Sequence, residues 1–533
     1  MFVVMKQFFA FFIGLFLCAH SVCADRLHEI LPEFEAYVEK VKQTWGAPGV
    51  AIAIVKGDET YVKAFGEREV GTDRKIDTNT VFQIASLTKN FLAHLFARLV
   101  QDGKVSWDDP VIKYMPQFFI DNDETTKQFT IRDLLSHRSG LPSFSGDTFW
   151  YIGFSQDEMV SGLSRLPLKN MLRSKYGYQN HLVGIASLIA EKITGKTIEV
   201  LFREYLFIPI GITSGGVSLE AISPKQSFIE RFLGSSKDLN VAYAHNDRGG
   251  VTHKLPFSSL IYLFPGTSGA SISISDYAKW LRFLVNQCAI NGAPLIAPEQ
   301  VKEIITPHIV CDMKPDDNQF PGDRYTDISY GMGHFLYTYG EGDKKVKARG
   351  HMGAFYGTRS LMMVVPEKKL GIAIFSNYGS FKVSFLPEIL INKFMDLYLN
   401  LSPIDWNTRI KNEFDKMKRM NKQFYEEERL QNPKPARKLE NYVGRFKSDV
   451  YGELSLVIES NKLHLMYRDK KIPLQHYNGN QFSFSAYLLS ESFCNSDIGR
   501  IEFGSTTGRN IDVCSLWTLL REGKDEGLFR RVT

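Results

Sequence analysis

Two apolar hairpins, one near each end of the longer part of the chain, constrain the fold most strongly. The first spans residues 49–65 and turns at Gly57-Asp58, and the second spans residues 360–377 and turns at residues 367–369. Short apolar runs bounded by turn residues indicate buried strands. Strands so far apart in sequence bury their apolar faces best in one core. We therefore predict one antiparallel sheet whose strands come from both ends of a domain.

Helices are predicted around this sheet. Residues 25–43 have apolar positions at helical spacing, and residues 385–399 form a second, more apolar helical segment. Between the hairpins, roughly residues 86–340, we expect a large, mostly helical insertion. The predicted fold class is therefore α+β, an antiparallel sheet flanked by helices.

The C-terminal part of the chain has a different character. A chain of 533 residues is too long for one compact unit. Residues 404–436 are dense in charge of both signs and close with Pro433 and Pro435, which indicates a solvated helix and a linker. Residues 437–533 alternate apolar and polar positions in short runs, as strands do. We predict a domain over 25–403, then the linker, then a small β-rich domain.

The N-terminus has the pattern of a signal peptide. Lys6 precedes the apolar run of residues 8–19, and Val22 and Ala24 supply the small residues before a cleavage site, which we place after Ala24. The apolar run is too short for a comfortable membrane span, so no integral span is expected after removal of residues 1–24. A lipoprotein is less favoured, because neither cysteine of this segment follows a small residue. The mature protein is predicted to be periplasmic or secreted.

Four cysteines remain after removal of this segment, in a compartment where disulfides persist. Local pairing would join Cys288 with Cys311 and Cys494 with Cys514, and four buried free thiols are nearly as compatible with the sequence. No C-x-x-C or His-Glu-x-x-His spacing is present. No metal and no cofactor are therefore predicted.

Charge and glycine patterns argue against other partners. The formal charge of +5 is small for this length and forms no basic stripe, so nucleic acid is not an expected partner. Residues 266–269, Gly-Thr-Ser-Gly, lack the Gly-Lys-Ser/Thr of a phosphate-binding loop. We interpret them as a loop, with Ser275 as the N-cap of a helix through Trp280.

Ser86-Leu87-Thr88-Lys89 is the first candidate for chemistry. Three residues are about one helical turn, so Ser86 and Lys89 share a face, and the apolar residues that follow over 91–99 indicate a buried helix. Serine is a weak nucleophile without a base nearby. A lysine can act as that base once neutral. Lowering its pKa from about 10.4 to near 7 requires roughly 4–5 kcal/mol, which burial and a cationic neighbour can supply.

Three further motifs follow in order, and together they resemble the serine β-lactamase-like superfamily, with class C β-lactamases, D,D-peptidases, penicillin-binding proteins and related esterases as the nearest branches. The segments that carry the resemblance are residues 82–89, 134–142, 178–180 and 351–353, the last followed by Gly357 and Ser360. The resemblance runs from about residue 28 to 400. The C-terminal domain resembles the barrel-like domains appended to several of these enzymes.

The resemblance implies a role for each site residue. Ser86 would be acylated, Lys89 would accept its proton, and Tyr178 would pass a proton to the leaving group. Asn180 would hydrogen-bond a substrate amide. Tyr398-Leu399-Asn400 fits the same Tyr-x-Asn pattern but follows the last motif, so position favours Tyr178.

The strand-edge motif implies substrate contacts. Gly353 allows close approach of backbone to ligand, and the N–H groups of Ser86 and Ala354 would form the oxyanion hole. His351 would contribute to substrate binding and is expected to titrate near neutral pH. His137, in the second motif, is interpreted as part of a structural turn.

Met352 departs from the resemblance, because the family usually has threonine or serine there. Its thioether cannot donate a hydrogen bond to the carboxylate of a penicillin or a terminal D-alanine, so β-lactam recognition is expected to suffer. We predict a secreted serine hydrolase that forms an acyl-Ser86 intermediate with an amide, peptide, β-lactam or ester, and cell-wall-derived peptides are among the expected substrates. The alternative is a catalytically weak, penicillin-binding-like protein that holds cell-wall peptides without efficient turnover. The oligomeric state is not predicted.

Overall fold

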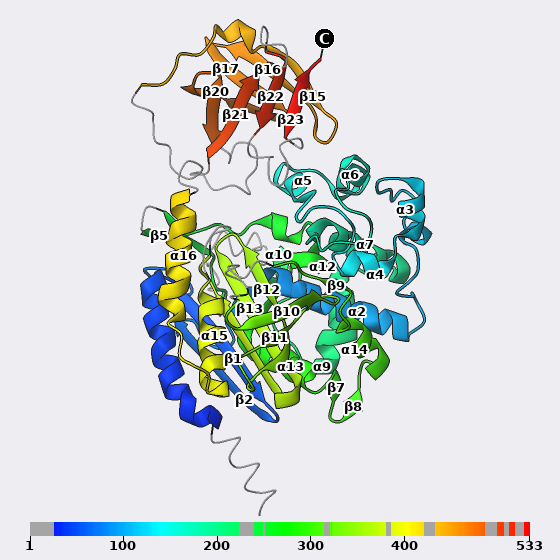
Figure 1. The fold of residues 1–533 in the computed structure, drawn as a ribbon, viewed down its shortest axis with the longest axis vertical. Coiled ribbons are helices and arrows are strands. Elements are labelled where there is room, and N and C mark those ends of the chain that lie inside the picture. The colour runs from blue at the N-terminus through cyan, green and yellow to red at the C-terminus, as the bar shows by residue number, and fades with distance from the viewer. Residues whose placement is uncertain are drawn as a thin grey trace, which may run out of the picture.

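The computed structural model describes residues 26–222, 239–248, 251–313, 320, 322–379, 385–420, 432–485, 498–505, 511–516 and 527–532. The predicted signal peptide and Cys494 lie outside these ranges. Figure 1 shows a larger α/β part and, above it, a smaller sheet built from the C-terminal residues.

An eight-stranded antiparallel sheet forms the centre of the larger part, in the order β2-β1-β14-β13-β12-β11-β10-β9. The two sequence hairpins meet in it, since β1 pairs with β14 from Val50 opposite Ser376 to Lys56 opposite Leu370. The prediction of one antiparallel sheet from both ends of a domain is confirmed. Its strands are β1 (Gly49–Lys56), β2 (Glu59–Gly66), β9 (Ile309–Val310), β10 (Tyr325–Tyr330), β11 (Phe335–Tyr339), β12 (Val346–Phe355), β13 (Thr358–Val365) and β14 (Leu370–Ser376).

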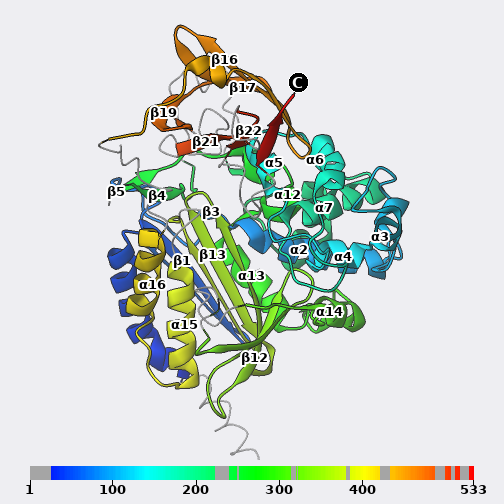
Figure 2. The same ribbon diagram turned by 45° about the horizontal axis from the view of Figure 1, so that its top comes forward.

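Helices cover both faces of this sheet, because its strands are apolar on both. Ala51 and Ala53 pack with α2 (Thr88–Gln101) and α13 (Ile274–Val285). Val50 and Ile52 face the opposite way, toward the helix over residues 26–45 and α15 (Leu386–Leu399). Figure 2 shows these two outer helices side by side against one face.

The insertion between the hairpins is mostly helical but ends in strands. Strands β9 to β11 belong to the central sheet although they lie within the predicted helical region. The helical elements are η1 (Ala85–Leu87), α2, η2 (Val111–Lys113), α3 (Asp123–Gln128), α4 (Ile131–Leu135), α5 (Asp147–Tyr151), α6 (Gln156–Gly162), η3 (Leu163–Arg165), α7 (Asn180–Thr194), α8 (Ile198–Phe202), the π-helical η4 (Arg203–Phe207), α9 (Ile208–Ile210), α10 (Leu219–Ile222), η5 (Ser259–Tyr262), α12 (Pro265–Ser268), α13, α14 (Pro298–Ile304) and η6 (Pro366–Lys368). Short pairs of strands are β3 (Val81–Gln83) with β6 (Ser271–Ser273), β4 (His245–Arg248) with β5 (Val251–Lys254), and β7 (Ala289–Ile290) with β8 (Ala293–Pro294).

Two local predictions in this region are wrong. Helix α13 begins at Ile274, and its N-cap is Ser273, not Ser275, because the Ser273 side chain accepts a hydrogen bond from the N–H of Asp276. Most of the predicted glycine-containing loop forms the short helix α12. Pro at its first helical position supplies the required φ angle.

The segment after the larger sheet is less solvated than its charge suggested. Helix α16 (Trp406–Met420) begins with a fully buried Trp406, whose Nε1 donates to Asp396 Oδ2 of α15 at 2.7 Å. Ile410 is also buried. One apolar stripe thus holds the start of α16 against α15, and the remaining charge lies outward.

A nine-stranded antiparallel sheet follows, in the order β18-β17-β16-β15-β23-β22-β21-β20-β19. The prediction of a small, barrel-like, all-β C-terminal domain is confirmed. Its strands are preceded by η7 (Leu439–Asn441) and are β15 (Gly444–Ser448), β16 (Gly452–Glu459), β17 (Lys462–Tyr467), β18 (Lys470–Pro473), β19 (Gln475–Asn478), β20 (Gln481–Ser485), β21 (Ile498–Gly504), β22 (Val513–Leu516) and β23 (Leu528–Arg531).

The described cysteines, Cys288, Cys311 and Cys514, are buried free thiols. The predicted Cys288–Cys311 disulfide is wrong, and the structure shows why. Cys288 packs in the cluster with α2 and α13, whereas Cys311 packs in the other main cluster of the larger part. Cys514 is free as well, and its predicted partner, Cys494, lies outside the described residues.

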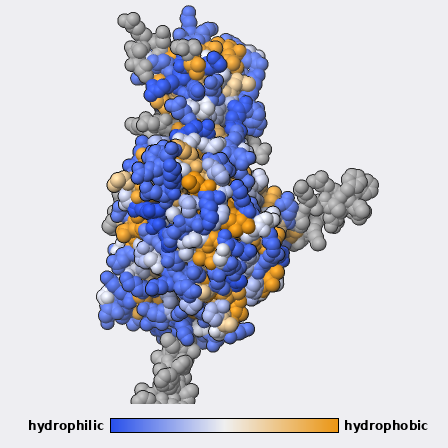
Figure 3. Space-filling model, turned by 90° about the vertical axis from the view of Figure 1, so that its right-hand side faces the viewer, coloured by the Kyte–Doolittle hydropathy of each residue, from blue (hydrophilic) through white to orange (hydrophobic). Residues whose placement is uncertain are grey.

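Within the described ranges, no helix combines the length and the apolar character that crossing a bilayer requires. Figure 3 shows one face of the molecule, where hydrophilic residues predominate and hydrophobic patches lie among them. Exposed large hydrophobic side chains are scattered along the chain and include Met171, Ile208, Val251 and Val310.

Candidate active site

Ser86 lies in η1, the tight turn that leads directly into α2. The residue before it, Ala85, has φ of 46°, a left-handed conformation that costs a non-glycine residue about 1–3 kcal/mol. Thr88 stabilises the turn: its Oγ1 donates to the Ala85 carbonyl at 2.6 Å and accepts from the N–H of Ala270 at 3.0 Å. The turn leaves Ser86 partly exposed at the start of a buried helix.

Lys89 is 1% exposed and points at the Ser86 hydroxyl. Its Nζ lies 2.9 Å from Ser86 Oγ, 2.7 Å from Asn180 Oδ1 and 3.2 Å from the carbonyl oxygen of Thr267. Burial lowers the pKa of Lys89 to about 7, against the opposing negative charge of Asp147. A substantial fraction of Lys89 is therefore neutral near pH 7 and can accept a proton.

Tyr178 and Asn180, at the start of α7, both lie beside Lys89. Asn180 is the first residue of that helix, and the Tyr178 ring centroid lies 5.0 Å from Lys89 Nζ. Burial raises the pKa of Tyr178, and a hydrogen bond with the Ser86 hydroxyl opposes the rise. Tyr178 is therefore a neutral phenol, able to donate a proton.

The edge of β12 closes the site on the other side. Pairing of β12 with β11 ends where Gly350 lies opposite Phe335, and the rest of the strand runs past η1. A Cβ on Gly353 would lie 2.1 Å from the carbonyl oxygen of Ile84, so only glycine fits there without displacement. Ala354, the predicted second oxyanion donor, follows in the same strand and is partly exposed.

His351 lies on the same face of β12 as Gly353, and its side chain is 1% exposed. Its Nε2 lies 3.0 Å from Tyr330 Oη, and its Nδ1 lies 2.6 Å from the carbonyl oxygen of Met352. Burial, with the charge of Lys89, lowers the pKa of His351 to about 3. The expectation that His351 titrates near neutral pH is therefore wrong.

Met352 alternates to the opposite face of β12, as its pairing with Leu361 shows. The side chain is 9% exposed and packs in the apolar cluster that includes α15. The thioether therefore packs away from the face that carries His351 and Gly353, and position 352 supplies no hydroxyl.

Comparison with known proteins identifies the family. A family model described as Beta-lactamase matches residues 34–387, most of the chain. The chain belongs to the beta-lactamase family. The predicted resemblance is therefore confirmed, and the site lies entirely within the matched range.

Curated proteins with diverse names are similar to this chain. The unguisins hydrolase ungD of Aspergillus violaceofuscus is 26% identical over 488 residues, covering 86% of this chain and 83% of the relative. A putative D-alanyl-D-alanine carboxypeptidase of Escherichia coli K12 is 24% identical over 283 residues, which cover 49% of this chain and 65% of the relative. The family relationship supports a hydrolase.

The solved structure of the octameric penicillin-binding protein homologue from Pyrococcus abyssi shares the fold. It matches with a TM-score of 0.57 and 19% identity, covering 91% of this chain and 98% of that one. Because the match includes nearly the whole chain, the two-part architecture is not peculiar to this beta-lactamase family member.

His137 occupies the structural turn predicted for it, with φ of 58°. Its ring lies 4.4 Å from that of Tyr178 and 4.5 Å from that of Tyr330, and its Nδ1 accepts from the N–H of Gln179 at 3.1 Å. Burial lowers its pKa well below the usual value. Neutral His137 thus packs against the ring of Tyr178.

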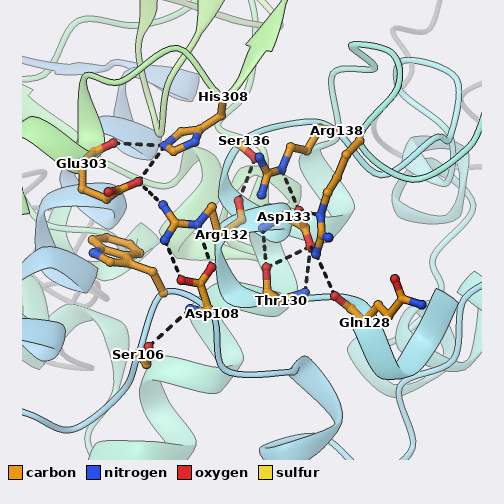
Figure 4. Close-up of polar contacts among 12 residues, drawn as sticks. Ser106, Asp108, Gln128, Thr130, Arg132, Asp133, Ser136, Arg138, Glu303 and His308 are labelled. Carbon is orange, nitrogen blue, oxygen red and sulfur yellow. Dashed lines mark hydrogen bonds and ion pairs between the residues drawn. The ribbon is translucent and has the colours of Figure 1, made fainter. Parts of the chain in front are cut away.

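A buried ion-pair network holds that turn (Figure 4). Asp133 is fully buried and accepts from Arg138 Nε at 2.6 Å and from Arg173 Nη2 at 2.7 Å. The same carboxylate completes the capping box with Thr130 at the start of α4. Burial acts to raise the pKa of Asp133, but the two arginines and Thr130 outweigh it and lower the pKa. The network fixes the turn on both sides of His137.

Sequence reasoning missed two contributors. Asp147 Oδ2 accepts from Asn180 Nδ2 at 2.7 Å, and a lone aspartate has no distinctive spacing in the sequence. Thr267 acts through its backbone carbonyl, which no side-chain pattern reveals.

Tyr398, of the second Tyr-x-Asn match, lies at the end of α15. It stacks on Phe394, 5.9 Å away between ring centroids, in the cluster on the α15 face of the sheet. Across the described residues, no group of three or more His, Cys, Asp or Glu side chains could hold a metal.

Proposed function

We propose that this protein is a secreted serine hydrolase that cleaves amide or ester bonds through an acyl-Ser86 intermediate. One observation carries the proposal: a buried Lys89 with a pKa near 7 lies 2.9 Å from the Ser86 hydroxyl. A base poised near the working pH is what general-base activation of serine requires.

The first half-reaction would form the acyl-enzyme. The Ser86 hydroxyl gives its proton to neutral Lys89 while Oγ attacks the substrate carbonyl carbon. The N–H groups of Ser86 and Ala354 stabilise the oxyanion that forms. Tyr178 then protonates the leaving nitrogen or oxygen as its bond to carbon breaks, and Lys89 returns the proton to Tyr178.

The second half-reaction would release the acid product. Water attacks the acyl carbon and gives a proton to Lys89. Collapse of the tetrahedral intermediate expels Ser86 Oγ, which recovers a proton from Lys89. Positioned acid–base groups of this kind contribute about 10²–10⁴-fold each.

Local charge favours substrates without a carboxylate next to the scissile bond. His351 is neutral at physiological pH, and Met352, packed in the α15 cluster, supplies no hydrogen-bond donor from its side chain. Hydrolase and carboxypeptidase names among the relatives support peptide or amide bonds as substrates. We therefore rank esters and neutral amides or peptides ahead of β-lactams.

The cell-wall-derived peptides proposed as substrates agree with export through residues 1–24. The resulting location is periplasmic or extracellular. The similarity to a putative D-alanyl-D-alanine carboxypeptidase supports this location.

A second candidate is a penicillin-binding-like protein that holds cell-wall peptides without efficient turnover, and Met352 favours it. Ser86→Ala separates the two: under the first proposal turnover vanishes, and under the second ligand binding survives with no turnover in either protein.

Intact-mass analysis with a fluorophosphonate tests the favoured proposal. We expect one adduct, mapped to Ser86, and no adduct with Ser86→Ala. Ser164→Ala, which removes an exposed hydroxyl outside the site, should label like the native protein. A folded native protein that forms no adduct at Ser86, and hydrolyses no member of an ester and peptide panel, would refute it.

A further inference from the structure

The C-terminal sheet contacts the helical region directly beside the active site (Figures 1 and 2). The ring of Tyr451 packs edge-on against Phe149 of α5, with centroids 5.7 Å apart at 70°. The guanidinium of Arg468 lies 4.4 Å from the Phe154 ring centroid, and its Nη2 lies 3.0 Å from both carboxylate oxygens of Glu158 in α6. Tyr451 lies in the turn between β15 and β16, and Arg468 lies in the turn between β17 and β18, so two turns of the C-terminal sheet contact α5, α6 and their connection.

This contact is continuous with the cores on both sides. Buried residues of the C-terminal sheet and of the helical region form a single apolar cluster. Tyr451 is 3% exposed, and its carbonyl accepts from Tyr467 Oη at 2.9 Å. Phe149 is fully buried and stacks on Phe154 with centroids 4.9 Å apart. Movement of the sheet would therefore move α5.

Helix α5 begins at Asp147, two residues before Phe149. Gly146, its N-cap, has φ of 84°, and a Cβ there would lie 2.5 Å from His181 Nδ1, so the start of the helix packs closely against His181. Asp147 accepts from the Asn180 amide nitrogen, which leaves Asn180 Oδ1 facing Lys89 at 2.7 Å. Without that acceptor, the amide has no fixed orientation toward Lys89.

Four titratable groups face Lys89 from the surrounding elements. Asp147 on α5 raises the pKa of Lys89, in opposition to burial. Tyr178, His137 and His351 surround it from the start of α7, the turn after α4 and β12, and the pKa shift of each keeps it uncharged at neutral pH. Asp147 is thus the charged group among them, and its position controls how far the pKa of Lys89 falls.

We infer that the C-terminal sheet is a positioning element of the catalytic centre, which acts through α5: Tyr451 and Arg468 hold the helix, and Asp147 holds Asn180 against Lys89. Asp147 is accordingly a positioning residue. This inference rests on the proposed function for its catalytic consequence, but its structural part concerns the protonation of Lys89 and can be measured without turnover.

The test compares variants that break the contact from either side. Arg468→Gln and Glu158→Gln each remove the ion pair, and glutamine at position 158 can still cap the N–H of Ser155, as Glu158 does now. Arg445→Gln is the matched control, because Arg445 pairs with Glu453 inside the C-terminal sheet. Asp147→Asn provides the reference shift.

The primary measurement is the titration of Lys89 by NMR on protein carrying ¹³C-labelled lysine side chains, with Lys89→Arg to assign the signal. We expect Asp147→Asn to lower the pKa of Lys89, and Arg468→Gln and Glu158→Gln to shift it in the same direction by less. The double variant should add nothing to Arg468→Gln, since Arg468→Gln already removes both the ion pair with Glu158 and the contact with Phe154. Ester hydrolysis should fall by about threefold or more in both single variants and stay unchanged in Arg445→Gln.

Equal Lys89 titration in the native protein, Arg468→Gln and Glu158→Gln would overturn the inference. A shift in the pKa of Lys89 in a protein that neither forms an adduct at Ser86 nor hydrolyses any member of the ester and peptide panel would support the positioning role of the C-terminal sheet and refute the proposed hydrolase. The two failures are thus distinguishable.

Discussion

Tyr330 donates a hydrogen bond to His351, with 3.0 Å between Oη and Nε2. The direction follows from the other ring nitrogen: Nδ1 lies 2.6 Å from the Met352 carbonyl, which can only accept, so Nδ1 carries the proton. Both ring nitrogens are thereby satisfied in the neutral form. A second proton would displace the Tyr330 hydroxyl from its donor role, in agreement with the lowered pKa of His351.

The pH profile should therefore report Lys89 and not His351. Lys89 acts as a base only when neutral, so kcat/KM for a neutral ester should rise with pH through about 7 and be lost as pH falls below it. His351→Gln, which retains an acceptor for Tyr330, should leave that midpoint unchanged. Stopped-flow or steady-state profiles from pH 5 to about 9 measure this. A decline above about pH 6.5 that disappears in His351→Gln would contradict it.

Acid instability must be separated from this effect. Burial lowers the pKa of His94 and His351 to about 3 and that of His181 to about 4. Below the ordinary histidine pKa of about 6.5 the unfolded chain therefore binds more protons than the folded chain, so stability falls as pH drops. Unfolding curves at each pH provide the control for the activity profile.

Gly353→Ala should cost activity more than it costs folding. Its Cβ would lie 2.1 Å from the carbonyl oxygen of Ile84, two residues before Ser86, so either the edge of β12 or the turn η1 that holds Ser86 must move. We expect a destabilisation of about 1–3 kcal/mol. The loss of kcat/KM should reach about 100-fold, because a displacement of about 1 Å misaligns the oxyanion donors.

Gly371→Ala is the matched control in the same sheet. Its added Cβ would meet Val285 Cγ2, the end of a side chain, at 3.1 Å. Urea unfolding and ester hydrolysis measure both variants. If Gly353→Ala retains native kcat/KM, the close approach of β12 to the nucleophile turn has no catalytic role.

What could be predicted from the sequence follows from local periodicity. The hairpins, the buried helix after Ser86 and the barrel-like C-terminal sheet have short-range apolar patterns, and these folded as expected. Strand β9 has only two residues, and the register of β10 with β11 shifts between Thr326 and Ser329, so the end of the insertion lacks a clean alternation. Its strands were therefore hidden within a region predicted to be helical.

The remaining differences depend on tertiary burial. His351 looks like any histidine in the sequence, and its protonation is determined by its burial, among groups such as Tyr330 and Phe335, and by the charge of Lys89. Likewise, Cys288 and Cys311 are close in sequence but pack in different clusters of the larger part. Asp147 contacts Asn180 only because the fold places the start of α5 beside the start of α7. Such relationships are fixed by long-range packing, which residue spacing does not encode.

Met352 gives the sharpest prediction about substrate choice. Its thioether packs with Leu361 on the α15 face of β12 and offers no hydrogen bond to a carboxylate. The native protein should therefore hydrolyse a short-chain ester faster than a chromogenic cephalosporin. Threonine is shorter and carries a hydroxyl, so Met352→Thr supplies the missing hydrogen bond if that hydroxyl turns from the α15 face toward the substrate. A hydroxyl–carboxylate hydrogen bond contributes about 1.5–3 kcal/mol, so cephalosporin hydrolysis should then improve relative to the ester by about tenfold or more.

Met352→Leu separates that hydrogen bond from packing. Leucine keeps an apolar side chain of similar volume and supplies no hydroxyl, so the ratio of the two kcat/KM values should stay at its native value. Both variants are measured beside the native protein, with unfolding curves to correct for lost stability. Native hydrolysis of the cephalosporin at or above the rate for the ester would show that this site recognises the β-lactam carboxylate by other groups, and Met352 would then not determine substrate choice.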